Sequence, residues 1–325
     1  TEGSRVTPRL LTLALAAAFA LPAHADQANK SAPSPIANAG AATVVARPLL
    51  WKVSDADNDV YLLGSFHLLK SDDYPMPVEI DRAFDDAESL LFEVDPREMT
   101  SPETAAIMQK YMAYEDGQSL SKVLPKATLE RLHTLVSASG GSVQALEQSE
   151  PWLVNLGLVL GVSQAMGLKA DLGLDRHLME RAAKAGKPAG GLETIDAQMQ
   201  AMDSVPYPEQ AQGLDEFLVD PKKAVQQLQD MHAWWRAGDV ERLDTGMRAE
   251  MAAKSPQSYK LLDVDRNEAW LPQIEKRLGG STSDDTLVVV GALHLLGSDG
   301  LVEKLKAKGY KVERVCDGCE AAAAK

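Results

Sequence analysis

The chain has 325 residues, 45% of them hydrophobic and 25% charged, which is the composition of a globular protein large enough to bury a sizeable core. Its formal net charge of −14 argues against a nucleic-acid-binding protein, because such proteins need a basic face to neutralise phosphates. Beyond the N-terminal stretch no segment has the apolar length of a transmembrane helix, so we expect no stable membrane insertion after signal cleavage.

Residues 1–25 predict a cleavable export signal. A basic start precedes an apolar run over residues 10–21, which is too short for a membrane span, and residues 23–25 form a small-x-small cleavage motif. We therefore expect a periplasmic or secreted mature protein, with an uncleaved N-terminal anchor as the alternative. Residues 26–47 are rich in Ala, Ser and Pro and predict a flexible linker.

A strand–helix–strand unit follows the linker. Residues 49–54 and the apolar run that begins at Val60 predict a hairpin, because an Asp-rich turn separates them. The second of these strands ends in the Gly-x-x-His motif of residues 64–67. Helical spacing over residues 77–88 and an apolar run over residues 89–94 then complete a βαβ unit.

The middle of the chain predicts a large helical insertion, about residues 98–280. Residues 186–194 interrupt it as a short strand or loop. The segments with amphipathic or buried-helix patterns are 98–115, 125–139, 142–148, 151–166, 174–185, 195–204, 209–218, 221–237, 240–253 and 259–278.

The C-terminal part repeats the plan of the first unit. Residues 287–290 predict a buried strand, and residues 291–294 form a second Gly-x-x-His motif. A helix through Lys308 and a strand over residues 310–315 follow. The sequence therefore predicts an α/β (α+β) fold in which two pseudo-symmetric, βαβ-containing halves build a central mixed sheet.

Cys316 and Cys319 are the two cysteines of the chain and lie close together after the last predicted strand. An oxidising compartment favours a disulfide between them. A redox motif normally opens a helix within a βαβ unit, whereas this pair precedes an Ala-rich tail. We therefore expect a structural disulfide, with a catalytic pair as the alternative.

Two histidines share one local context. His67 and His294 each close a Gly-x-x-His motif after a buried strand, where open α/β sheets place their ligands. A fold that brings them together creates a candidate two-imidazole site. Catalytic metals take two or three protein ligands from His and carboxylate and keep a position open for water, so a carboxylate partner is expected nearby.

Glu93 is the first candidate for that carboxylate, because an acid inside an apolar strand is costly unless it is paired or metal-bound. Asp95 alternates to the same face and could replace or assist Glu93, or could instead cap the following segment. Glu193 precedes a predicted helix. It is either a first-turn acid that complements the helix dipole or a supporting or substrate-side carboxylate.

Arg266 and Asn267 open the last long helical pattern. By pattern alone Arg266 is a surface residue, but in a carboxylate-rich site it could bind a substrate carboxylate or stabilise an oxyanion. The signatures of several other chemistries are absent from the sequence: it has no Gly-x-Ser-x-Gly elbow, Walker loop, Gly-x-Gly-x-x-Gly motif or His-Glu-x-x-His helix.

Together these motifs resemble the TraB/GumN family, which belongs with the TIKI metalloproteases and the erythromycin esterase/ChaN-like superfamily. The motifs that carry the resemblance stand in the order expected of that family, at residues 62–67, 92–95, 191–194, 265–267 and 290–294. The resemblance implies a single domain over residues 48–315 with the helical insertion described above, followed by a C-terminal tail, residues 316–325.

The resemblance also implies a metal-dependent hydrolase site at the two Gly-x-x-His turns, since TIKI-like members are peptidases that use manganese or cobalt. Carried over to this chain, it makes His67 and His294 metal-proximal residues and Glu93 a metal ligand or general base. Arg266 and Asn267 are then substrate-side, and we count Glu193 with Glu93, Arg266 and Asn267 as the candidate catalytic residues. We predict an exported peptidase that acts on a peptide or protein with a divalent metal ion, manganese or cobalt favoured and zinc possible.

Two other functions are open on the same scaffold. The first is a non-catalytic protein that sequesters a peptide or haem, in which the histidine pair holds the ligand without turnover. The second is a structural accessory of an export or polysaccharide system, which would need no metal.

Overall fold

The computed structural model describes residues 46–114, 117–280, 283–317 and 319. The predicted signal peptide and residues 26–45 of the predicted linker lie outside this part of the chain. Among the helices of the described ranges, none is both long and apolar enough to cross a membrane.

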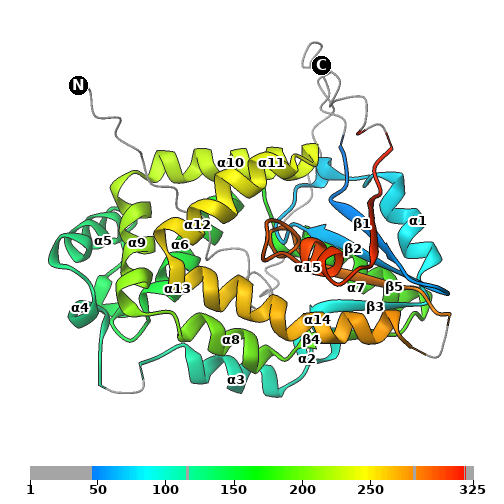
Figure 1. The fold of residues 1–325 in the computed structure, drawn as a ribbon. Helices are drawn as coiled ribbons and strands as arrows, with labels where there is room; N and C mark the ends of the chain where they lie inside the picture. Colours follow the sequence, from blue (N-terminus) through cyan, green and yellow to red (C-terminus); the bar gives the residue numbers. More distant parts are fainter. Residues whose placement is uncertain (1–45, 115–116, 281–282, 318, 320–325) are drawn as a thin grey trace, which may run out of the picture.

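A six-stranded mixed sheet forms one end of the molecule, in the order β4-β3-β5-β2-β1-β6 (Figure 1). β1 runs antiparallel to both of its neighbours, β2 and β6, and all the other pairings are parallel. The predicted hairpin and the predicted central mixed sheet are thus confirmed. The strands are β1 (Leu50–Ser54), β2 (Asp59–Ser65), β3 (Ser89–Val94), β4 (Ala189–Glu193), β5 (Thr286–Gly291) and β6 (Lys311–Arg314).

The two predicted βαβ units interlock in this sheet. The first runs from β2 through α1 (Val78–Asp86) to β3 and crosses β5, whereas the second runs from β5 through α15 (Leu301–Ala307) to β6 and crosses β2 and β1. The crossovers run in opposite directions, so right-handed connections place their helices on opposite faces. α1 is joined to α7 (Leu174–Ala185) by ion pairs of Arg181, and α15 packs on α14 (Asp265–Leu278).

The pairing of β2 with β5 fixes the relative position of the two Gly-x-x-His motifs. Both strands are apolar and almost wholly buried, as central parallel strands are. Ser65 lies opposite Gly291 in the register, so both motifs leave the sheet at the same edge. Gly64 allows the close approach, since an added Cβ there would lie 3.0 Å from the Leu49 Cβ and 3.1 Å from the Ala292 Cα.

The predicted insertion is largely helical, as Figure 1 shows, but residues 186–194 contain the edge strand β4. The segment 142–148 holds only the 3₁₀ turn Val143–Leu146. The remaining helices are α2 (Pro96–Met99), α3 (Glu103–Tyr111), α4 (Leu120–Val123), α5 (Lys126–Ala138), α6 (Pro151–Ala165), α8 (Ile195–Asp203), α9 (Tyr207–Val219), α10 (Pro221–Ala237), α11 (Val240–Leu243), α12 (Ala249–Lys254) and α13 (Pro256–Tyr259).

Two π-helical turns interrupt segments predicted as regular helices. Asp244–Arg248 separates α11 from α12, and Lys260–Val264 separates α13 from α14. A π-helical turn inserts one residue into the helical repeat and rotates the following side chains to a new face; such turns are common at functional sites. The second turn directly precedes Arg266 and Asn267.

The buried apolar side chains form two clusters. The larger one surrounds the sheet and includes Phe92 and Val289. The smaller one lies among α3, α6, α8 and the π-helical turn Lys260–Val264, and Val94 at the end of β3 belongs to it. The carboxyl end of β3 therefore lies where the two clusters meet.

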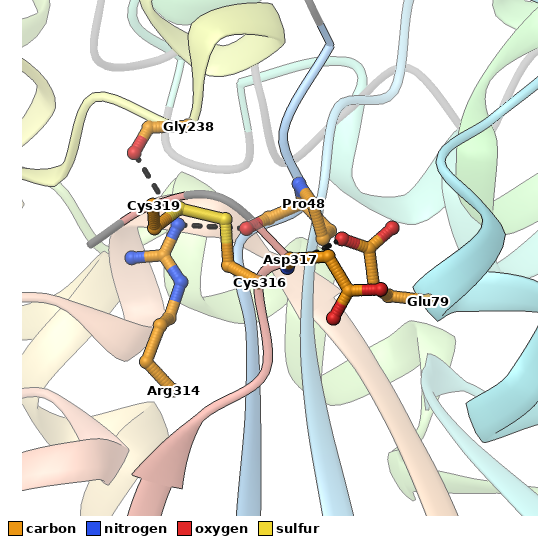
Figure 2. Close-up of a disulfide and its surroundings, with 7 residues drawn as sticks. All are labelled: Pro48, Glu79, Gly238, Arg314, Cys316, Asp317 and Cys319. Atoms are coloured by element: carbon orange, nitrogen blue, oxygen red, sulfur yellow. Dashed lines mark hydrogen bonds between the residues drawn. A yellow bond between two sulfur atoms is a disulfide. The ribbon is translucent and has the colours of Figure 1, made fainter. Parts of the chain in front are cut away.

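Cys316 and Cys319 are joined by a disulfide after β6, as predicted (Figure 2). The tail is also held by hydrogen bonds. The Asp317 N–H donates to the Glu79 carboxylate of α1 at 2.7 Å, and Arg314 Nη2 donates to the Pro48 carbonyl at 2.7 Å. The disulfide closes a short local loop beside β6, at the outer edge of the sheet, which suits a structural role.

Replacing both cysteines with serine is expected to cost at most about 2 kcal/mol of unfolding free energy, because a four-residue loop gains little entropy when it is opened. Urea denaturation of the double variant measures this cost. We also expect its function to be unchanged. A loss of function with normal stability would favour the catalytic alternative.

Candidate active site

His67, Glu93 and His294 converge at the carboxyl ends of β2, β3 and β5. The Nε2 atoms of His67 and His294 lie 3.9 Å and 4.0 Å from the Glu93 Oε1 atom. The three side chains are buried, with exposed fractions of 4–6%. The fold thus brings together two residues that are 227 positions apart in the sequence, together with the carboxylate expected beside them.

Gly291 leaves a space between these three groups. An added Cβ on Gly291 would lie 3.2 Å from the Glu93 Oε1, 3.5 Å from the His67 Nε2 and 3.5 Å from the His294 Cδ2. The Gly291 N–H also donates to the Glu93 Oε1 at 2.7 Å, which fixes that carboxylate. The glycine of the second motif therefore both orients Glu93 and leaves room for a small group between the donors.

Asp175 at the start of α7 fixes the orientation of His67. Its carboxylate lies 2.9 Å from the His67 Nδ1, so Nδ1 donates to Asp175 and Nε2 is turned towards Glu93, 3.9 Å from its Oε1. Burial disfavours the charged imidazole, but the Asp175 carboxylate outweighs it and raises the pKa of His67 above its ordinary value. A carboxylate behind an imidazole is the usual support for a metal-binding or proton-accepting histidine.

Asn267 fixes His294 in the same tautomer. The Asn267 Nδ2 donates to the Asp263 Oδ1 at 2.8 Å and to the Asp299 carbonyl at 3.0 Å, so its Oδ1 accepts from the His294 Nδ1 at 2.8 Å. The Nε2 lone pair of His294 is thereby turned towards the site. Burial, together with the nearby Arg266 charge, lowers the pKa of His294 to about 3, so this imidazole is neutral at physiological pH.

Arg266 is the buried cation of the site, with an exposed fraction of 5%. Its Nη2 donates to the Glu93 Oε2 at 2.7 Å and to the Glu193 Oε1 at 2.6 Å, and its Nη1 donates to the His294 Nε2 at 3.1 Å. The guanidinium also lies 4.6 Å from the centre of the Trp270 ring. The interpretation of Arg266 as a surface residue is therefore wrong.

Glu93 is ionised in this setting. Burial opposes its charge, but the positive groups around it, led by Arg266, hold the pKa of Glu93 at about 2. Gln198 on α8 donates to Glu93 at 3.2 Å and to Glu193 at 3.3 Å. These donations fix the Gln198 amide, and its Oε1 has no hydrogen-bond partner within the described part of the chain. This oxygen is therefore a buried acceptor that the described residues leave unsatisfied.

The donors fit a divalent metal ion in their chemistry. Imidazole Nε2 atoms and a carboxylate oxygen are ligands of manganese, cobalt and zinc. Ligands of one ion lie roughly 4 Å apart or less, so the separations of 3.9 Å and 4.0 Å are at the upper limit. Within the described ranges no group of three or more His, Cys, Asp or Glu side chains is placed so that it could hold a metal ion, and Arg266 donates to the His294 Nε2.

The sequence profile of the TraB/PrgY/gumN family matches residues 49–314. The chain belongs to this family. Its relatives include the uncharacterised protein YbaP of Escherichia coli, which is 25% identical over 246 residues, 76% of this chain and 87% of YbaP. The metalloprotease TIKI2 of Danio rerio is 22% identical over 306 residues, 78% of this chain and 58% of TIKI2. No solved structure matches the chain.

All the family-motif residues singled out from the sequence except Asp95 meet at this one site. They are His67, Glu93, Glu193, Arg266, Asn267 and His294. Asp95 instead caps α2, where its carboxylate accepts the Arg97 N–H at 2.8 Å. Of the two roles expected for Asp95, the structure therefore shows the capping of the following segment.

Sequence reasoning did not find Asp175, Gln198 and Asp263. Asp175 is a first-turn acid of α7, a position where acids are common for local reasons. Asp263 lies in the π-helical turn, and burial raises its pKa to about 7. A histidine that binds a metal or accepts a proton is usually oriented by an acid, so an acid could be expected behind each Gly-x-x-His motif. The sequence around the motifs does not indicate which acid this is.

Proposed function

We propose that this protein is a hydrolase that cleaves peptide or related amide bonds with the help of a divalent cation, manganese or cobalt favoured and zinc possible. The observation that carries the proposal is the convergence of the His67 Nε2, the His294 Nε2 and the Glu93 Oε1 on the space at Gly291. The relationship to the TIKI2 metalloprotease supports the same class of reaction. We also propose that the protein works after export.

His67, His294 and Glu93 would hold the cation. When bound, such an ion polarises the scissile carbonyl and lowers the pKa of a nearby water. The low pKa of Glu93 suits a ligand, because it keeps the carboxylate charged at neutral pH. It also makes Glu93 a weak proton acceptor. The low pKa therefore supports the ligand role of Glu93 over the general-base role.

Arg266 is placed to stabilise negative charge on the substrate. Two of its nitrogens already donate into the site, and its position is fixed by Glu193, whose carboxylate contacts both the Nε and the Nη2 of Arg266. Pre-oriented donors of this kind stabilise a developing oxyanion without reorganisation. The free Gln198 Oε1 can accept a substrate N–H. Asn267 acts through His294, whose tautomer it sets.

Peptide hydrolysis in the presence of manganese tests the proposal. We expect His67→Ala and His294→Ala each to lower kcat/KM by at least about 10³-fold, and a chelator to abolish the activity of the wild-type protein. His133→Ala on α5 is the matched control and should retain full activity. Wild-type activity in both His67→Ala and His294→Ala would refute the proposal.

Cation-independent hydrolysis is the second candidate, favoured by the pairing of His67 with Asp175. Such a pair can take a proton from water, because the Asp175 carboxylate raises the pKa of His67, whereas the low pKa of Glu93 makes it a weak proton acceptor. The same assay separates the two candidates. Activity that survives chelation but is lost in His67→Ala favours the second.

A further inference from the structure

Ser65, the last residue of β2, carries a buried hydroxyl that the described part of the chain leaves unsatisfied. Its side chain has an exposed fraction of 0%, and its Oγ has no hydrogen-bond partner among the described residues. A buried hydroxyl without a partner is unfavourable, because the group gives up its hydrogen bonds to water on folding. Such groups are rare enough in proteins to need an explanation, and a role in the chemistry of a site is one.

The register of the sheet places this hydroxyl beside the space at Gly291. Ser65 lies directly opposite Gly291 in the pairing of β2 with β5. Side chains at paired positions of neighbouring strands point to the same face of a sheet, so the Ser65 side chain stands next to the position that a side chain on Gly291 would take. That position lies 3.2 Å from the Glu93 Oε1 and 3.5 Å from the His67 Nε2.

The two Gly-x-x-His motifs differ in this respect. They are shifted by one residue against each other, because Gly64 pairs with Val290 and Ser65 pairs with Gly291. Ala292 holds the place of Ser65 in the second motif, but it lies against Gly64, where an added Cβ would be 3.3 Å from the Ala292 Cβ. The first motif therefore supplies a hydroxyl to the space at Gly291, and the second motif supplies none.

The chemistry of the neighbouring groups restricts the role of this hydroxyl. A nucleophilic serine needs a hydrogen bond to a base, and the Ser65 Oγ makes none to His67 or Glu93. The Glu93 carboxylate accepts hydrogen bonds but donates none, whereas a hydroxyl does both and can bind a water molecule in either orientation. A methyl group at Gly291 would already be in tight contact with Glu93, so the space suits a water molecule rather than a larger group.

We propose that the Ser65 hydroxyl hydrogen-bonds the water that attacks the substrate, and that it holds this water at Gly291 together with Glu93 and His67. The inference rests on the proposed hydrolase function and adds a catalytic residue to it. A water with three fixed partners is already oriented when the substrate arrives, which lowers the entropic part of the barrier.

Ser65→Ala tests this role, because it removes the hydroxyl and leaves the strand unchanged. In peptide hydrolysis with manganese we expect kcat to fall by about tenfold while KM changes by less than about twofold, since the hydroxyl contacts the water and not the substrate. Ser65→Thr keeps a hydroxyl and should recover most of the lost activity. Ser163→Ala is the matched control: Ser163 is equally buried, but its Oγ donates to the Val159 carbonyl within α6.

Urea denaturation distinguishes this role from a structural one. Ser65→Ala breaks no hydrogen bond within the described part of the chain, so it should unfold at the same urea concentration as the wild-type protein or at a higher one. A lower midpoint would mark the hydroxyl as structural and overturn the inference.

A crystal structure of the wild-type protein gives a readout that does not depend on activity. We expect an ordered water within about 3.2 Å of both the Ser65 Oγ and the Glu93 Oε1. Absence of this water, or full activity in Ser65→Ala, overturns the inference and leaves the hydrolase intact. The ordered water without any peptide hydrolysis by the wild-type protein supports the water site and overturns the hydrolase alone.

Discussion

Replacing Arg266 with methionine is expected to lower the free energy of unfolding by about 3–5 kcal/mol at neutral pH. The variant would leave Glu93 and Glu193 buried without the cation that contacts both of them. Methionine is close to arginine in length, so the lost charge rather than an empty space dominates the effect. Urea denaturation monitored by circular dichroism measures the change.

The pH dependence of this loss follows from the pKa of Glu93. Arg266 and its neighbours lower that pKa from 4.5 to about 2, so the stabilisation is fully present above pH 4.5 and disappears as the pH falls towards 2. The difference between Arg266→Met and the wild-type protein should therefore shrink over this range. Arg82→Met removes an exposed ion pair with Asp317 and is the control, for which we expect little change at any pH.

Replacing Gly291 with alanine is expected to lower kcat/KM by about 100-fold or more while the protein stays folded. The added methyl group would occupy the space that His67, Glu93 and His294 face, at 3.2–3.5 Å from their atoms. Only the contact with the Glu93 Oε1 is tight, and a shift of a few tenths of an ångström relieves it; the backbone of Gly291 has a φ of −52°, which alanine adopts readily. The loss of activity is expected because the methyl group would fill the space in which the cation and the substrate would meet, and a misplacement of about 1 Å can cost 10²-fold in rate.

Gly190→Ala is the matched control for this prediction. Gly190 lies in β4 of the same sheet, and an added Cβ would meet only the Leu91 Cδ2 at 3.4 Å. Both variants should unfold at similar urea concentrations, but Gly291→Ala alone should lose hydrolysis and manganese binding measured by calorimetry. Full activity in Gly291→Ala would mean that the reacting groups do not use this space.

Glu93 was recognisable from the sequence for a physical reason. An acid in an otherwise apolar strand must be paired, and in the structure it is paired with Arg266 and with the Gly291 N–H. Arg266 itself was not recognisable as buried. The π-helical turn Lys260–Val264 shifts the helical repeat just before it, so periodicity cannot predict which face of α14 Arg266 occupies.

The sequence by itself determined the strands apart from β4, most of the helices and the two Gly-x-x-His motifs, because hydrophobic period, glycine and proline act over a few residues. It also showed that each histidine follows a buried strand. Only the tertiary structure decided that β2 and β5 are neighbours with Ser65 opposite Gly291, which brings His67 and His294 together. It alone supplied Asp175 and Asp263 as their supports, since contacts between distant segments leave no local pattern in the chain.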